Sequence, residues 1–116
     1  MTMQDQMYLY FDQQLTTSKD RRQALLADDR GDEANFEQIR TNVYDIFKTI
    51  LNVADKMPNP HAFFAAKLEE IPQNWKTSYE AALQHQDVVK IQQETIKLET
   101  LAQIKAAFAK AGGAQQ

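Results

Sequence analysis

Residues 25–36, LLADDRGDEANF, decide how this chain folds. Helical patterns lie on both sides of the stretch, but its middle, DDRGDE, has no apolar side chain to hold a helical turn against a core. Gly31 disfavours a helix interior by about 1 kcal/mol relative to alanine. Asp32 followed by Glu33 is typical of a helix N-terminus, where carboxylates interact favourably with the helix dipole. We therefore predict a turn at Arg30-Gly31, with Asp32 as the N-cap of the next helix.

The alternative is one long helix that runs through the glycine. Carried back at about 100° per residue, Leu25 and Leu26 stay on the side of the apolar stripe that follows, so helical phase allows continuity. A short N-terminal helix would then end near Leu15, and the long helix would cover 18–57. With the turn, one helix covers about 3–29 and the next returns antiparallel to it.

The first helical pattern has an apolar stripe that stops halfway. Its apolar residues are Met3, Met7, Phe11 and Leu15. Residues 16–23 are then eight consecutive polar residues, and Ser18 and Arg22 occupy positions where the stripe should continue. Lys19, Arg21 and Arg22 form a small basic cluster among aspartates. We interpret this cluster as salt-bridging surface, with the stem of Arg22 packed across the stripe.

The middle helical pattern runs from Glu33 to Met57. Its apolar stripe consists of Phe36, Ile39, Val43, Ile46, Phe47, Ile50, Val53, Ala54 and Met57. Arg40 lies at the edge of the neighbouring face, and we interpret it, like Arg22, as structural. The helix ends at MPNP, residues 57–60, because the residue before a proline is displaced from the α region and proline has no N–H to donate.

The second half of the chain predicts a short helix and a long one. Asn59 is suited to cap a helix that begins at Pro60 and ends near Ile71, where Pro72 breaks or kinks the chain. The long run that follows, 73–111, has no proline or glycine, and its segment QHQD before Val88 is the expected place for any bend, with the aspartate as a new cap. Gly112-Gly113 ends the run.

These patterns predict an all-α protein, an antiparallel helical bundle of three long helices plus one short connecting helix. Glycine and proline are scarce, with three of each in 116 residues. A chain of this length fits a single domain, which we place at 1–111. The last five residues, 112–116, are expected to form a disordered tail.

Composition excludes several classes of function. The chain has no cysteine, which excludes disulfides, thiolate metal sites and a cysteine nucleophile. It begins MTMQDQ without a signal-peptide pattern and has no apolar run of about 20 residues that could span a bilayer. We therefore expect a cytoplasmic protein that does not enter membranes.

Motifs for catalysis and for cofactor or metal binding are missing. A di-iron bundle would need Glu-x-x-His pairs, but the residues three before His61 and His85 are Pro58 and Ala82. The acidic turn around Gly31 fails as an EF-hand loop, since non-ligand residues fall where oxygen ligands belong. No activated serine and no glycine-rich phosphate loop is recognisable. We expect no enzyme activity and no cofactor, although an enzyme with a noncontiguous site stays an alternative.

Nucleic-acid binding is weakly indicated. The net charge is −3 and the predicted pI is near 5.3, whereas nucleic-acid-binding domains are typically basic. From residue 88 onwards, however, the chain has four lysines and only two glutamates. A nucleic-acid-associated regulator that uses this basic C-terminal helix is therefore an alternative function.

The C-terminal helix carries more apolar surface than one buried face requires. A near-heptad seam is formed by Val88, Ile91, Thr95, Leu98, Ala102 and Ala109. Leu101, Ile104 and Phe108 recur at helical spacing on another side, beside Lys97. A helix that is apolar on two sides either lies inside a bundle or offers one side to a partner. We predict that Leu101, Ile104, Phe108 and Lys97 form an interaction face for a second copy or a partner helix, so that the chain is a non-enzymatic interaction or adaptor module, and a dimer.

The tripeptide Arg30-Gly31-Asp32 matches the adhesion signature that integrins recognise. At average residue usage, such a tripeptide arises by chance in roughly one chain of this length in fifty. No export signal or disulfide supports secretion, and a helix breaker is needed at this place for structural reasons. We therefore interpret the tripeptide as part of a turn and not as an integrin ligand.

Overall fold

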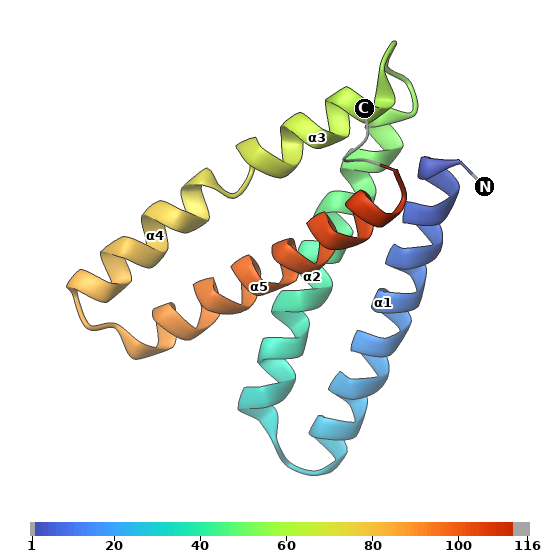
Figure 1. The fold of residues 1–116 in the computed structure, drawn as a ribbon. Helices are drawn as coiled ribbons and strands as arrows, with labels where there is room; N and C mark the ends of the chain where they lie inside the picture. Colours follow the sequence, from blue (N-terminus) through green and yellow to red (C-terminus); the bar gives the residue numbers. More distant parts are fainter. Residues whose placement is uncertain (1, 113–116) are drawn as a thin grey trace.

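The computed structural model describes residues 2–112, which fold into three long and two short helices. The long helices are α1 (Met3–Ala27), α2 (Gly31–Ala54) and α5 (Val88–Lys110). The short helices are α3 (Pro60–Glu70) and α4 (Gln73–Gln84). In Figure 1, α1 and α2 form an antiparallel hairpin, α3 and α4 follow one another almost in line, and α5 returns beside α4 and crosses α2. The predicted all-α antiparallel bundle is confirmed.

The turn between α1 and α2 lies slightly earlier than predicted. Asp29 has a φ of 57°, a left-handed conformation that aspartate tolerates better than most residues. The Arg30 N–H donates to the Leu25 carbonyl at 2.8 Å, and α2 begins at Gly31. The prediction of a turn is therefore confirmed, and the long continuous helix is wrong.

The predicted N-cap of α2 needs a correction. Arg30 occupies the cap position, and its side chain makes no capping hydrogen bond. Because Asp29 already reverses the chain, the cap of the helix lies two residues before the expected cap, Asp32. Asp32 and Glu33 lie in the first turn instead, where carboxylates still favour the positive end of the helix dipole.

The second half of the chain follows the sequence signals closely. The Asn59 side chain accepts a hydrogen bond from the Ala62 N–H at 3.1 Å, and Pro60 is the first residue of α3. After Pro72 the chain continues as α4. The expected bend before Val88 is a full reversal, with Gln86 at a φ of 54° and Asp87 capping α5 through the Lys90 N–H. The predicted long run is thus two antiparallel helices.

The core lies where α1, α2, α3 and α5 meet. Its most buried large side chains include Met7, Phe11, Phe47, Leu51, Phe64 and Ile104. The Phe64 ring lies between three others, with centroids 6.4 Å from Phe11, 6.3 Å from Phe47 and 5.1 Å from Phe108. The pairs with Phe11 and Phe47 are edge-on, a geometry that adds to the stabilisation by burial. The core therefore joins all three long helices through α3.

The buried face of α2 is rotated from the predicted stripe. Val43, Phe47 and Ala54 are buried as expected, but Ile46 and Val53 are exposed. Thr41 and Tyr44, which were not in the stripe, are buried because their side chains contact α1. The packing of α1 thus brings polar residues of α2 inside the bundle.

Two predictions concern the ends and membrane contact. Gly112, with a φ of 95°, follows the last turn of α5, and residues 113–116 of the expected disordered tail lie outside the described residues. Over residues 2–112, no helix combines the length and the hydropathy needed to cross a bilayer.

Candidate functional site

The predicted interaction face on α5 is part of the core. Leu101, Ile104 and Phe108 are 3%, 0% and 6% exposed. The Phe108 ring lies 5.1 Å from Phe64 and 5.0 Å from the His61 ring, both on α3. Because the hairpin and α3 cover this side of α5, the three residues offer no surface to a partner in this fold. The sequence could not show this, since it does not reveal which neighbouring helix covers which side.

Lys97, the fourth residue of the predicted face, contacts α4. Its ammonium group lies 3.1 Å from a carboxylate oxygen of Glu94 and 5.9 Å from the centroid of the Trp75 ring. Lys90 reaches the same carboxylate at 3.6 Å, and Lys105 pairs with Glu69 of α3 at 3.0 Å. Three of the four lysines in the basic C-terminal segment are therefore engaged in ion pairs within the bundle.

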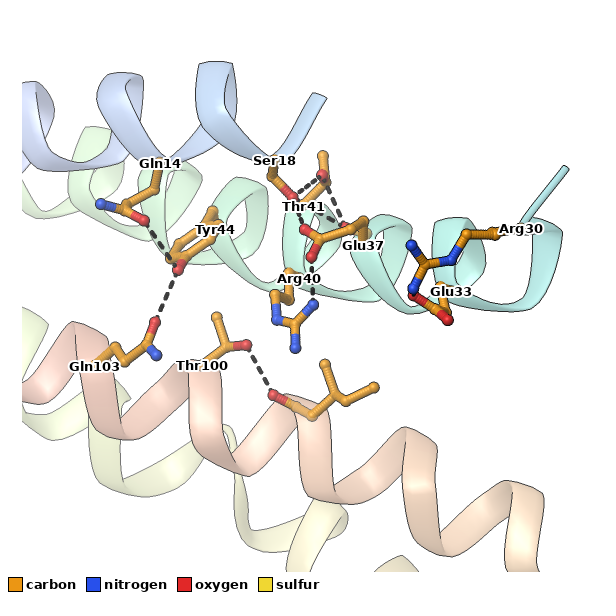
Figure 2. Close-up of polar contacts among 11 residues, drawn as sticks. Gln14, Ser18, Arg30, Glu33, Glu37, Arg40, Thr41, Tyr44, Thr100 and Gln103 are labelled. Carbon is orange, nitrogen blue, oxygen red and sulfur yellow. Dashed lines mark hydrogen bonds and ion pairs between the residues drawn. The ribbon is translucent and has the colours of Figure 1, made fainter. Parts of the chain in front are cut away.

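A polar pocket lies between α1, α2 and α5, on the turn side of the core. Ser18 is where the apolar stripe of α1 stops, and it is buried against α2. Its hydroxyl lies 2.9 Å from a carboxylate oxygen of Glu37, and Thr41 donates to the Ser18 hydroxyl at 3.0 Å. Glu37 and Thr41 are each 6% exposed. The three side chains thus form a buried hydrogen-bonded network between the two helices, as Figure 2 shows.

The wall of the pocket towards the core is formed by Tyr44. Its hydroxyl donates to Gln103 of α5 at 3.2 Å and lies 3.5 Å from the amide oxygen of Gln14 on α1. In Figure 2 the phenol lies between these two amides. Tyr44 therefore links all three helices at this level of the bundle.

Two arginines complete the pocket. Arg40 pairs with the Glu37 carboxylate at 2.5 Å, and Arg21 of α1 lies on the rim with no ion-pair partner in the described part of the chain. Burial raises the pKa of Tyr44, whereas a hydrogen bond with Tyr10 and the positive charges of Arg40 and Arg21 oppose that rise. Two cationic groups thus face a single carboxylate.

The pocket has the size and lining of a small polar binding site. Its volume is about 180 Å³, and the lining consists of Gln14, Thr17, Ser18, Arg21, Glu37, Arg40, Tyr44 and Gln103. From the sequence, Arg40 and the cluster around Arg21 were predicted to be structural, and nothing indicated that they come together. The sequence nonetheless contains a signal for this pocket. In an antiparallel hairpin, residues at equal distances from the turn face each other, and the polar run 16–23 lies at the level of Glu37 and Thr41.

A groove of about 370 Å³ lies between the N-terminal halves of α2 and α5, and its polar lining consists of Asp32, Asn35, Gln92 and Gln93. Phe36, Ile39 and Val89 supply its apolar lining. Val88 and Val89 are 64% and 61% exposed, although Val88 was predicted to be buried in the heptad seam. Figure 1 shows why: the first turns of α5 extend beyond the point where it crosses α2. The rest of the seam is not buried either, since Ala102 and Ala109 are exposed and Ile91, Thr95 and Leu98 are half-buried. The seam prediction is therefore wrong along the whole of α5.

Neither site resembles a metal centre, and comparisons with known proteins give no family. Within residues 2–112, no group of three or more histidine, aspartate or glutamate side chains could hold a metal ion. Searches with protein-family models, among curated proteins and among solved structures found no match to this chain.

Proposed function

We propose that this chain is a non-enzymatic, cytoplasmic interaction module that self-associates through the groove between α2 and α5. The observation that carries the proposal is the exposed Val88-Val89 pair beside the groove lined by Phe36 and Ile39. Contiguous exposed apolar surface of this kind is typical of protein interaction sites. The absence of cysteine supports the proposed location.

A second copy of the chain fits this surface. The groove and the exposed Val88-Val89 pair lie side by side. A two-fold axis would therefore place the valines of each copy in the groove of the other. Asp32, at the start of α2, lines the same groove and would lie at the edge of this contact. The proposed interface thus lies on the C-terminal helix, as predicted from the sequence, but at the beginning of that helix and not at Phe108.

The alternative functions have less support. Binding of nucleic acid by α5 would need its lysines to be free, and Lys90, Lys97 and Lys105 form ion pairs within the fold. An enzyme would need a nucleophile or an acid–base pair beside a pocket. The polar pocket offers one carboxylate, on Glu37, which is already bound by Arg40 and Ser18.

The test is the mass of the protein in solution with Val89 replaced by lysine. At about 100 µM protein, where a micromolar complex would be formed, we expect the unmodified chain to be a dimer and Val89→Lys to be a monomer. Leu9→Lys is the matched control, because Leu9 is 46% exposed on α1, away from the groove, and it should leave the dimer intact. A monomeric unmodified chain, or equal dissociation in both variants, would overturn the proposal.

A further inference from the structure

We propose that the polar pocket between α1, α2 and α5 binds a small anion through a carboxylate or phosphate group. This inference does not depend on self-association. It rests on the placement of Arg21 and Arg40 around a cavity whose lining side chains are all polar, contributed by three helices.

Stability alone gives no reason for the polar lining. Ser18, Glu37 and Thr41 occupy buried positions in a small bundle that has little core to spare. Buried ion pairs generally add little net stability, since desolvation of the charges offsets their attraction, and apolar replacements of similar volume are often neutral or stabilising. A polar network in this place is therefore better explained by what it holds in position, which is the guanidinium group of Arg40.

The charge balance of the pocket favours an anion. Glu37 is hydrogen-bonded on both sides, by Ser18 and Arg40, and so fixes the Arg40 side chain. Arg21 then adds a positive charge that no carboxylate in the described residues neutralises within ion-pairing distance. Planar guanidinium groups match carboxylate and phosphate oxygens with two parallel hydrogen bonds each, which makes arginine the preferred residue for these anions.

The remaining lining supplies donors that can orient a bound anion. The Tyr44 hydroxyl lies between Gln14 and Gln103, and Thr17 adds a second hydroxyl on the α1 side. Each glutamine amide has two N–H donors in addition to the oxygen that now faces the phenol. With a volume of about 180 Å³, the pocket accepts several water molecules or a small anion, but not a nucleotide or a peptide.

The experiment is a nuclear magnetic resonance titration of the full chain with two probes, sodium phosphate and sodium succinate. Sodium chloride at the same ionic strength is the reference. We expect saturable shifts of the Gln14 and Gln103 side-chain amides, with a Kd on the order of 1 mM. Saturation with phosphate alone, with succinate alone or with both supports the proposal and identifies the preferred anion. Shifts that stay linear with both probes would overturn it.

Three variants connect the binding to the pocket. Arg21→Gln should raise the Kd about tenfold, corresponding to about 1.4 kcal/mol, without unfolding the protein, because Arg21 is an exposed residue without an ion pair in the described part of the chain. Gln103→Leu, on α5, should also weaken binding. Lys19→Gln removes the same charge two residues away, on another face of α1, and should leave the Kd within about twofold, well below the tenfold step. Equal weakening by Arg21→Gln and Lys19→Gln would indicate general electrostatic attraction and overturn the proposed site.

Discussion

The two ends of the α1–α2 hairpin differ in what they bury. Near the chain termini the helices enclose Met7, Phe11, Phe47 and Leu51, which are almost completely buried apolar side chains. Towards the turn the same interface holds Ser18, Glu37 and Thr41, joined by hydrogen bonds. Burial of apolar surface stabilises the apolar end. The hydrogen bonds of the polar end mainly fix the positions of its side chains.

The position of the other helices shows where the hairpin ceases to be covered. Figure 1 shows α3 beside the C-terminal end of α2 and α5 crossing the middle of the hairpin, so the turn end extends beyond both. Residues there, such as Leu26, are in fact exposed. The polar pocket lies at the border between these two regions.

The largest effect is expected in the core that continues the apolar end, from Phe108→Ala on α5. Phe108 is 6% exposed and packs on Phe64 and His61. Removing a buried aromatic ring loses its burial and leaves a cavity, so we expect the free energy of unfolding to fall by about 3–5 kcal/mol. Chemical denaturation measures the loss, and light scattering should show an unchanged mass.

Val88→Ala is the control for this prediction, since it shortens an apolar side chain of α5 that is 64% exposed. Below the concentration at which the chain self-associates, we expect a change of less than about 0.5 kcal/mol. A change of mass in Phe108→Ala with little loss of stability would contradict the core position of Phe108 and restore the interaction face predicted from the sequence.

A smaller effect is expected at the polar end, from Glu37→Ala. The substitution removes the hydrogen-bond partner of Ser18 and the ion-pair partner of Arg40. Leaving buried polar groups unpaired costs about 1–3 kcal/mol, and we expect a loss of about 2 kcal/mol, measured by urea denaturation. The combined variant Ser18→Ala, Glu37→Leu, Thr41→Val should recover this loss, because apolar replacement of a whole network is often neutral.

Glu33→Ala is the matched control for Glu37→Ala, since Glu33 pairs with Arg30 at the exposed turn and should contribute little. If Glu37→Ala destabilised the chain as much as Phe108→Ala, the polar end of the hairpin would contribute as much as the apolar core, and the contrast between them would be wrong. If the apolar combination failed to recover stability, the network would itself be a source of stability.

A still smaller effect is expected from Tyr8→Phe, at the edge of the apolar end. The Tyr8 hydroxyl lies 2.5 Å from the Asn52 amide oxygen and 2.6 Å from an Asp55 carboxylate oxygen, which connects α1 to the end of α2. Because the residue is only partly buried, we expect a loss of about 1 kcal/mol at neutral pH. Thermal unfolding followed by circular dichroism measures it.

The same residue gives a pH dependence. Burial, and then the hydrogen bond to Asp55, raise the pKa of Tyr8 to about 12 from the usual 10.0. The unfolded chain therefore loses this proton before the folded chain does, and the stability contributed by Tyr8 is complete below pH 10 and is lost as the pH rises to about 12. In Tyr8→Phe this alkaline loss should be smaller. An equal loss in both proteins would mean that Tyr8 titrates normally.

Much of the fold could be predicted from the sequence because its signals are local. Pro60, Asn59 and Asp87 act on the backbone within one helical turn, and the structure places them as expected. The candidate site could not be predicted in the same way. Whether Phe108 faces a partner or α3 depends on tertiary packing, and Arg21 and Arg40 meet only because the hairpin brings α1 and α2 together. The interruption of the α1 stripe at Ser18 indicated where this would happen, but not what it forms.

The smallest effect is expected from Gly31→Ala, in the turn that sets the register of the hairpin. A Cβ added to Gly31 meets nothing within 4 Å, and the left-handed conformation falls on Asp29, with a φ of 57°. Gly31→Ala should therefore stabilise the chain by about 0.5 kcal/mol, since alanine favours a helix and restricts the unfolded chain. Asp29→Ala should cost about 1 kcal/mol, because alanine adopts a left-handed φ less readily than aspartate. Denaturation of both variants separates the two roles. A loss of stability in Gly31→Ala would show that the turn depends on the glycine. The register that brings Ser18 opposite Thr41 would then depend on the glycine as well.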